Sequence, residues 1–173
     1  MGKVAWKKPT ILVGQTKAND SMADEMTELG SCVLDSTSLD TGEGSSEKLQ
    51  NEQQGVEDIQ PTDTGETTLT TNVIVKEIDL LKRIFGGTIV TNTEGKRELT
   101  GLKNGFAAYS ADFWSFDVFC PTGIAYKAPK TKIKALPQYV SDKGMLLAVT
   151  FTVVKPNNEE VDMITPYENF TAV

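Results

Sequence analysis

The chain has 173 residues, a length that suits one domain with a single hydrophobic core. Its formal net charge of −7 argues against a surface that grips the phosphate backbone of a nucleic acid or an anionic membrane. The N-terminus has no apolar run long enough for a signal peptide, and no segment approaches membrane-spanning length, so we expect a protein that is made and folded in a cytoplasm.

The first half of the chain predicts three strands. Residues 10–13 are a short apolar run closed by Gly14, and residues 15–26 read as a polar loop. Residues 30–39 mix β-branched and small polar side chains, which predicts a strand at a half-solvated position. Residues 67–75 alternate small polar and apolar residues and are rich in β-branched types, which is the clearest strand pattern in this half.

Residues 35–66, between the second and third of these strands, are strongly acidic. The segment contains nine acidic residues, one basic residue and no aromatic residue. Glycines and a proline interrupt any regular period, so the segment cannot bury enough apolar surface to order itself in isolation. We therefore expect a long extended loop that neighbouring chains hold in place.

The second half predicts the single helix and four more strands. Residues 77–85 place apolar side chains at helical spacing, with acidic residues first, basic residues in the last turn and a glycine pair behind them. The strands are predicted at 87–92, 113–120, 131–136 and 145–154, with a turn at 92–96. Residues 97–110 are less patterned, and residues 155–173 predict a loosely ordered C-terminal arm.

Together these elements predict a mainly β fold, namely a β-sandwich or small barrel with one packed α-helix and a long extended loop. We expect residues 1–173 to form one domain that carries the acidic loop at about 35–66 and the arm at about 155–173. The sequence shows no internal repeat.

Patterns for catalysis and metal binding are weak. The chain has no histidine, which removes Ser-His-Asp triads, Cys-His dyads and zinc sites that use imidazole. An enzyme would have to use a carboxylate pair, a Ser-Lys pair or a carboxylate-bound hard cation. Residues 40–44 resemble a calcium loop only superficially, because the alternating ligands are missing. We predict no catalytic residue, no cofactor and no metal, and we expect Cys32 and Cys120 to be buried free thiols.

Charges of opposite sign gather in two places. One predicted strand alternates lysine with other residues, whereas the acidic loop carries most of the negative charge. Lysines on an exposed strand can simply guard it against unwanted pairing. A basic and an acidic surface on one chain is also what head-to-tail self-association uses. The residues expected at contacts between subunits are Asp40, Glu43, Glu47, Glu52, Glu57, Asp58, Lys130, Lys132 and Lys134.

The order of these features resembles the tail tube proteins, or major tail proteins, of long-tailed bacteriophages and the tube proteins of contractile injection systems. The resemblance covers roughly residues 10–154: an early strand, an extended polar loop, the strand at 67–75, the helix at 77–85 and the later strands. It implies a structural virion protein, assembled in the bacterial host cytoplasm, whose copies form rings of six that stack into a hollow tube. Loops and arms would reach neighbouring subunits, other tail proteins would be partners, and DNA would pass only as cargo along a polar, acidic lumen.

Other classes of protein stay open at this point. Another virion component, such as a connector, tail terminator or head decoration protein, would share most of these features. A carbohydrate-binding or adhesin module would be a monomer with exposed aromatic residues, for which the aromatic run at 113–119 is a candidate, although core packing explains that run as well. A hydrolase or metal-dependent enzyme would need a concave cluster of carboxylates.

Overall fold

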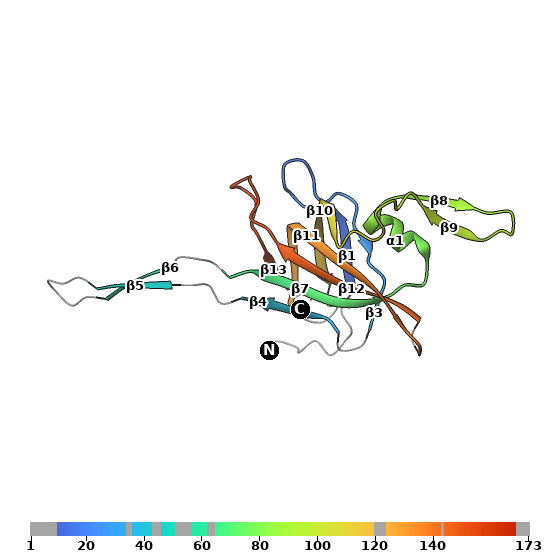
Figure 1. Cartoon of the computed structure of the whole chain (residues 1–173). Coiled ribbons are helices and arrows are strands. Elements are labelled where there is room, and N and C mark those ends of the chain that lie inside the picture. Colours follow the sequence, from blue (N-terminus) through green and yellow to red (C-terminus); the bar gives the residue numbers. More distant parts are fainter. Residues whose placement is uncertain are drawn as a thin grey trace, which may run out of the picture.

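The computed structural model of the chain is mainly β with one short helix, which confirms the predicted fold class (Figure 1). It describes residues 10–33, 36–42, 46–50, 57–61, 65–119, 124–142 and 144–168, with the backbone alone for 46–50, 57–61, Ala111 and Phe119. Within these residues, no helix is long and apolar enough to cross a membrane.

Nine strands form one large antiparallel sheet. They are β1 (Thr10–Gln15), β2 (Thr27–Glu28), β3 (Ser31–Cys32), β4 (Ser38–Thr41), β7 (Thr67–Ile74), β10 (Tyr109–Phe119), β11 (Ile124–Val140), β12 (Gly144–Val153) and β13 (Thr165–Glu168). Their order is β2-β1-β10-β11-β12-β7-β3, with β13 beside β11 and β4 beside β7. The middle of the sheet is therefore built from the three longest strands, β10, β11 and β12.

The sheet curls until its two ends almost meet. Strands β2 and β3 follow one another in the chain with only Leu29 and Gly30 between them, yet β2 pairs with β1 and β3 pairs with β7 at the opposite end of the sheet. The Leu29 amide donates to the carbonyl oxygen of Ile11 at 2.8 Å, and the Val33 amide donates to that of Asn72 at 2.7 Å. No closed barrel forms among the described strands, but residues 27–32 bridge the gap.

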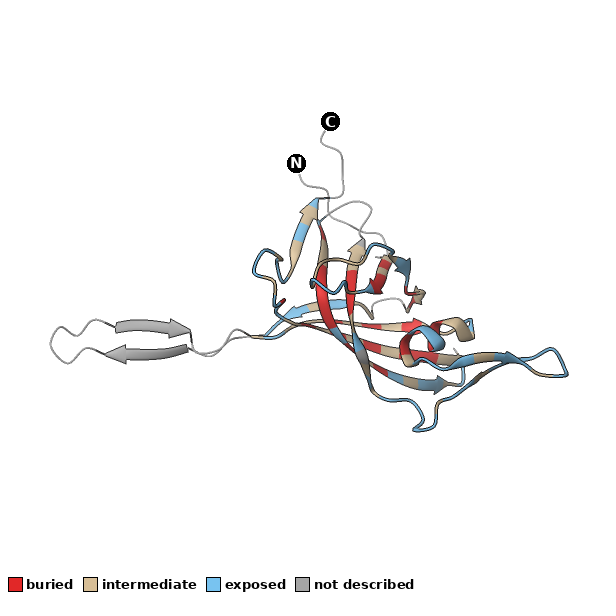
Figure 2. Cartoon of the chain, turned by 90° about the horizontal axis from the view of Figure 1, so that it is seen from above, coloured by how far each residue is buried: buried red, intermediate tan, exposed pale blue. Residues whose placement is uncertain are grey.

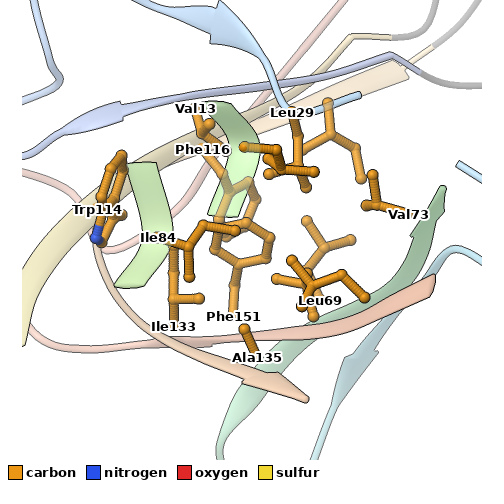
Figure 3. Close-up of a cluster of buried hydrophobic side chains, with 14 of the residues drawn as sticks. Val13, Leu29, Leu69, Val73, Ile84, Trp114, Phe116, Ile133, Ala135 and Phe151 are labelled. Carbon is orange, nitrogen blue, oxygen red and sulfur yellow. The ribbon is translucent and has the colours of Figure 1, made fainter. Parts of the chain in front are cut away.

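The hydrophobic core lies inside this curl. Inward-facing side chains alternate along β7 and along β12 from Leu147 to Val153, as a half-buried sheet requires, whereas β10 and β11 have short buried runs beside their register shift. The inward-facing side chains include Ile11 and Val13 on β1, Phe116 on β10, Ile133 and Ala135 on β11, Val149 and Phe151 on β12, and Leu69 and Val73 on β7 (Figures 2 and 3). The rings of Phe116 and Phe151 pack in a tilted pair with centroids 5.5 Å apart. This cluster ties the five longest strands of the sheet together.

Helix α1 (Ile78–Phe85) covers one opening of the core with Leu80, Leu81 and Ile84. Asp79 lies in its first turn and basic residues lie in its last turn, which complements the helix dipole. The helix ends at Gly86, whose φ of 77° favours glycine and whose amide donates to the carbonyl oxygen of Lys82 at 2.8 Å. The predicted helix at 77–85 is confirmed.

Two small ribbons lie outside the large sheet. Strand β5 (Ser46–Gln50) pairs with β6 (Glu57–Pro61), and β8 (Thr88–Thr91) pairs with β9 (Arg97–Thr100). Neither ribbon pairs with another described strand, and Figure 1 shows both extending away from the large sheet.

Several predicted boundaries were wrong. Residues 30–39 form two short strands instead of one, because the Ser36 hydroxyl accepts from the Asn72 amide at 3.1 Å and donates to the Val33 carbonyl oxygen at 2.7 Å, which interrupts the ladder. The acidic stretch at 35–66 is not a loop throughout, since β4, β5 and β6 lie within it. Strand β9 lies in the stretch that showed little pattern, and β13 lies in the predicted arm.

Candidate subunit interface

The side of the large sheet that faces away from the core is named the outer face here. Its residues are Ser38 and Asp40 on β4, Thr68 and Thr70 on β7, Thr150 and Thr152 on β12, Lys132 and Lys134 on β11, and Phe113 and Tyr109 on β10. The strand register aligns them in two rows that cross five strands. All of them are exposed or half-buried. The outer face is therefore polar, with an acid at the β4 end and two lysines near the other end.

The two lysines of the outer face lie against aromatic rings on the neighbouring strand. The Lys132 ammonium is 5.4 Å from the centroid of the Phe113 ring, and the Lys134 ammonium is 5.7 Å from that of the Tyr109 ring. Such contacts attract a cation electrostatically to the ring face. They favour positions of the two side chains over β10.

Exposed apolar surface borders the same lysines. Tyr109 is 60 % exposed and Leu136, two residues beyond Lys134 on the same side of β11, is 42 % exposed. Apolar groups grouped with charges in this way are common at contacts between proteins, where aromatic residues are enriched. Sequence reasoning named the lysines but missed these neighbours, because only the strand register brings Tyr109 beside Lys134.

Lys130 is not part of this surface, and its predicted place on an exposed strand face was wrong. Its side chain is buried, and its ammonium donates to the Asp20 carboxylate at 3.0 Å and lies 4.5 Å from the Phe113 ring centroid. The pairing of β10 with β11 shifts register near Pro129, and residues 128–131 are all buried. This bulge breaks the alternation on which the prediction depended.

Asp20 binds two segments of the chain through its carboxylate, one of which carries the buried Lys130 ammonium. Its carboxylate also accepts the amide of Asn157 at 2.6 Å. This hydrogen bond, followed by that from Lys130, lowers the pKa of Asp20 below its ordinary value of 3.8. The loop after β1, strand β11 and the segment after β12 are thereby joined at one point, which we name the Asp20 clasp.

The acidic residues expected at subunit contacts are only partly described. Asp40 is exposed on β4, where its carboxylate accepts the Ser38 hydroxyl at 3.2 Å. Glu43 and Glu52 lie outside the described residues. For Glu47, Glu57 and Asp58 the structure describes the backbone of β5 and β6 and nothing of the side chains.

The C-terminal strand β13 is held by a contact that the sequence did not indicate. The Tyr167 hydroxyl donates to the Asp117 carboxylate at 2.5 Å, and the Lys127 ammonium lies 5.6 Å from the Tyr167 ring centroid. Burial, and then the hydrogen bond to Asp117, raise the pKa of the Tyr167 phenol. The cluster attaches the end of the described chain to the middle of the sheet.

The β8–β9 ribbon is connected to the helix by one exposed ion pair. Arg97 donates to Asp79 at 2.8 Å, which lowers the pKa of Asp79, while Leu99 packs against the edge of the core. A ribbon of two strands is marginally stable without such support.

We expect Arg97→Ala to leave the melting temperature nearly unchanged, because exposed ion pairs contribute little to global stability. Amide hydrogen exchange in β8 and β9 should become faster, whereas exchange in the large sheet should not change. Lys96→Ala is the matched control, since Lys96 pairs with Glu94 within the ribbon tip and does not reach the helix. Equal exchange in the two variants would show that the Leu99 contact alone holds the ribbon.

One hollow of the described surface, of about 280 Å³, lies between residues 28–31 and the start of α1, and two of its basic side chains are already hydrogen-bonded. Its Lys76 ammonium donates to the Ser31 hydroxyl at 3.2 Å and its Arg83 guanidinium donates to the Glu28 carbonyl oxygen at 3.2 Å. Among the described residues, no group of three His, Cys, Asp or Glu side chains is placed to hold a metal ion. Cys32 is a buried free thiol as predicted, and Cys120 lies outside the described residues.

No family model and no curated protein sequence matches the chain.

Proposed function

We propose that this chain is a structural virion protein that associates with copies of itself into stacked rings, and that the stacked rings form the hollow tail tube through which phage DNA passes. Rings of six copies, other tail proteins as partners and a place in the virion tail follow from the resemblance to tail tube proteins. The proposal assigns the chain no catalytic reaction, and DNA touches it only as passing cargo.

The observation that carries the proposal is the pair of ribbons outside the large sheet. Each ribbon has two strands, and each pairs only with itself among the described elements. Two-stranded ribbons have little independent stability in water and leave two unpaired backbone edges. Contacts with neighbouring copies would cover those edges and stabilise the ribbons, which favours a subunit of an assembly over a protein that acts alone.

Electron microscopy of the purified chain, together with light scattering over a range of concentrations, tests the proposal. We expect rings at low concentration and stacked tubes at high concentration. Isolated rings that never stack would favour another virion ring component, such as a connector. A dispersed monomer at high concentration would contradict the proposal and favour a ligand-binding β module.

The ends of the acidic stretch lie close together, which allows a precise deletion. The Gly42 amide donates to the carbonyl oxygen of Glu66 at 2.7 Å, continuing the pairing of β4 with β7. Replacement of residues 43–65 by the dipeptide Asn-Gly should therefore produce an ordinary hairpin. We expect the shortened chain to keep the circular dichroism of the large sheet and to lose polymerisation in light scattering. Loss of the β spectrum would show that these residues are needed for folding instead.

A further inference from the structure

We propose that Lys132 and Lys134 of the outer face, together with the rings of Phe113 and Tyr109, receive the acidic segment of a second copy of this chain. The acidic segment is defined as residues 40–66. The inference depends on the proposed self-association and identifies the two surfaces that meet.

The two lysines carry charge that the described chain does not neutralise. Lys17, Lys96, Arg97 and Lys130 each form an ion pair with a carboxylate. No carboxylate of the described residues lies within 4 Å of Lys132 or Lys134, which are held over aromatic rings instead. Two ammonium groups that lie two residues apart on one side of β11, each over an aromatic ring, form a suitable acceptor for a negatively charged segment.

The acidic segment holds the whole net charge of the chain. Residues 40–66 contain eight acidic residues and one lysine, a net charge of −7, which equals the net charge of all 173 residues. The remainder of the chain has sixteen acidic and sixteen basic residues and is neutral. The attraction between copies is therefore directed from this one segment to the basic groups of the neighbour, and it is not opposed by repulsion between the neutral bodies.

The register of the sheet favours a neighbouring copy as the source of the segment. Asp40, the described acid at the start of the segment, lies in the same row as Lys132, but β7 and β12 separate their strands. Three strand spacings place them about 14 Å apart along the row, too far for an ion pair. Beyond Asp40, β5 and β6 pair with each other and extend away from the sheet that carries the lysines (Figure 1).

Donor and acceptor are different surfaces of one chain, so the contact can repeat head-to-tail. Such contacts repeat from copy to copy and produce closed rings or open filaments, depending on the rotation between neighbours. Two copies that exchanged their acidic segments reciprocally would form a closed symmetric dimer instead, which electron microscopy distinguishes from rings and tubes.

Charge reversal on each side tests the pairing. In 50 mM salt, K132E/K134E should raise the concentration needed for assembly by about tenfold or more, which corresponds to the loss of two exposed ion pairs and the gain of two repulsions. K103E/K155E is the matched control, because it changes the net charge equally at two exposed lysines outside the outer face. We expect less than a twofold change for this control. Circular dichroism verifies that each variant is folded.

Complementation then identifies the partner of the lysines. E47K/E52K/E57K should also assemble poorly alone, whereas an equimolar mixture with K132E/K134E should assemble, because each variant then presents the charge that the other lacks. Assembly of the mixture but of neither component supports the inference. Normal assembly of K132E/K134E, or failure of the mixture, overturns it while self-association of the unmodified chain still stands. A monomeric unmodified chain would instead contradict the proposed function itself.

Discussion

Gly30→Ala should destabilise the fold by about 3 kcal/mol or more, because it obstructs the point where the curled sheet joins its two ends. Gly30 has a φ of 139°, a conformation that side chains rarely adopt. A Cβ atom there would lie 2.9 Å from a methyl carbon of Val73, which is fully buried in the core. Relief of that contact would move β3 away from β7 and open the core.

Gly95→Ala separates the two causes of this effect. Gly95 also has a positive φ, 80°, but no atom lies within 4 Å of the Cβ that alanine would add. We expect a loss of about 1 kcal/mol from backbone strain alone. Urea unfolding of both variants gives the difference, which measures the steric contact with Val73 together with the greater backbone strain at a φ of 139°. Equal losses of stability in the two variants would mean that β3 moves away from β7 at no cost in free energy. Residues 27–32 would then not be needed to hold the two ends of the sheet together.

The sequence predicted well the elements that bury one face, because burial of one face gives their apolar residues a regular spacing. Strands β7 and β12 and helix α1 were predicted within one residue at each end, since their apolar residues recur at a period of two or near 3.6. The inward row of β12, from Leu147 to Val153, is the clearest case. The local sequence pattern is enough to predict an element that has one buried face and one solvent-exposed face.

The longest strand was the hardest to predict. Strand β11 has 17 residues, of which only 131–136 were expected, because Pro129 and Pro137 usually end a central strand. In the structure the carbonyl oxygen of Pro129 accepts the hydroxyls of Thr16 and Ser115, each at 2.7 Å, next to the register shift with β10. Side chains from distant segments thus form hydrogen bonds to a backbone carbonyl group at the register shift. A local sequence pattern cannot predict these long-range hydrogen bonds.

The charges of the candidate interface could be read from the sequence, but their positions could not. Lys130, Lys132 and Lys134 are two residues apart, so the sequence predicts that all three point to the same side of the strand. In the structure a bulge turns Lys130 inward, where it pairs with Asp20 in a loop more than 100 residues earlier. Sequence spacing predicts which side chains point the same way, whereas tertiary contacts decide which of them water reaches.

Lys130→Ala should lower the melting temperature by roughly 10 °C, because it leaves the Asp20 carboxylate enclosed without its cation. The Lys130 side chain is only 5 % exposed and that of Asp20 is 14 % exposed. Lys132→Ala is the matched control, since the exposed Lys132 side chain lies near the same Phe113 ring, and a shift of no more than about 2 °C is expected for it. Differential scanning calorimetry compares the two.

The double variant D20N/K130M should recover much of the loss, because neither buried charge is then left unpaired. Asparagine suits position 20, where φ is 61°, and its amide oxygen can still accept the Asn157 amide. A double variant as unstable as Lys130→Ala would show that packing of the lysine stem, and not charge, sets the stability of the Asp20 clasp.

The Asp20 clasp should also stabilise the fold less in acid, because the pKa of Asp20 is lower in the folded chain. Because the folded chain lowers this pKa below 3.8, the unfolded chain binds the proton more readily. The stabilisation is thus fully present above about pH 5 and is lost as the pH falls through the lower, folded value. The difference in unfolding free energy between the unmodified chain and Asp20→Asn should therefore shrink from pH 7 to pH 3. A difference that stayed constant over this range would mean that the folded and unfolded chains bind the Asp20 proton equally, and that the clasp contributes no pH dependence.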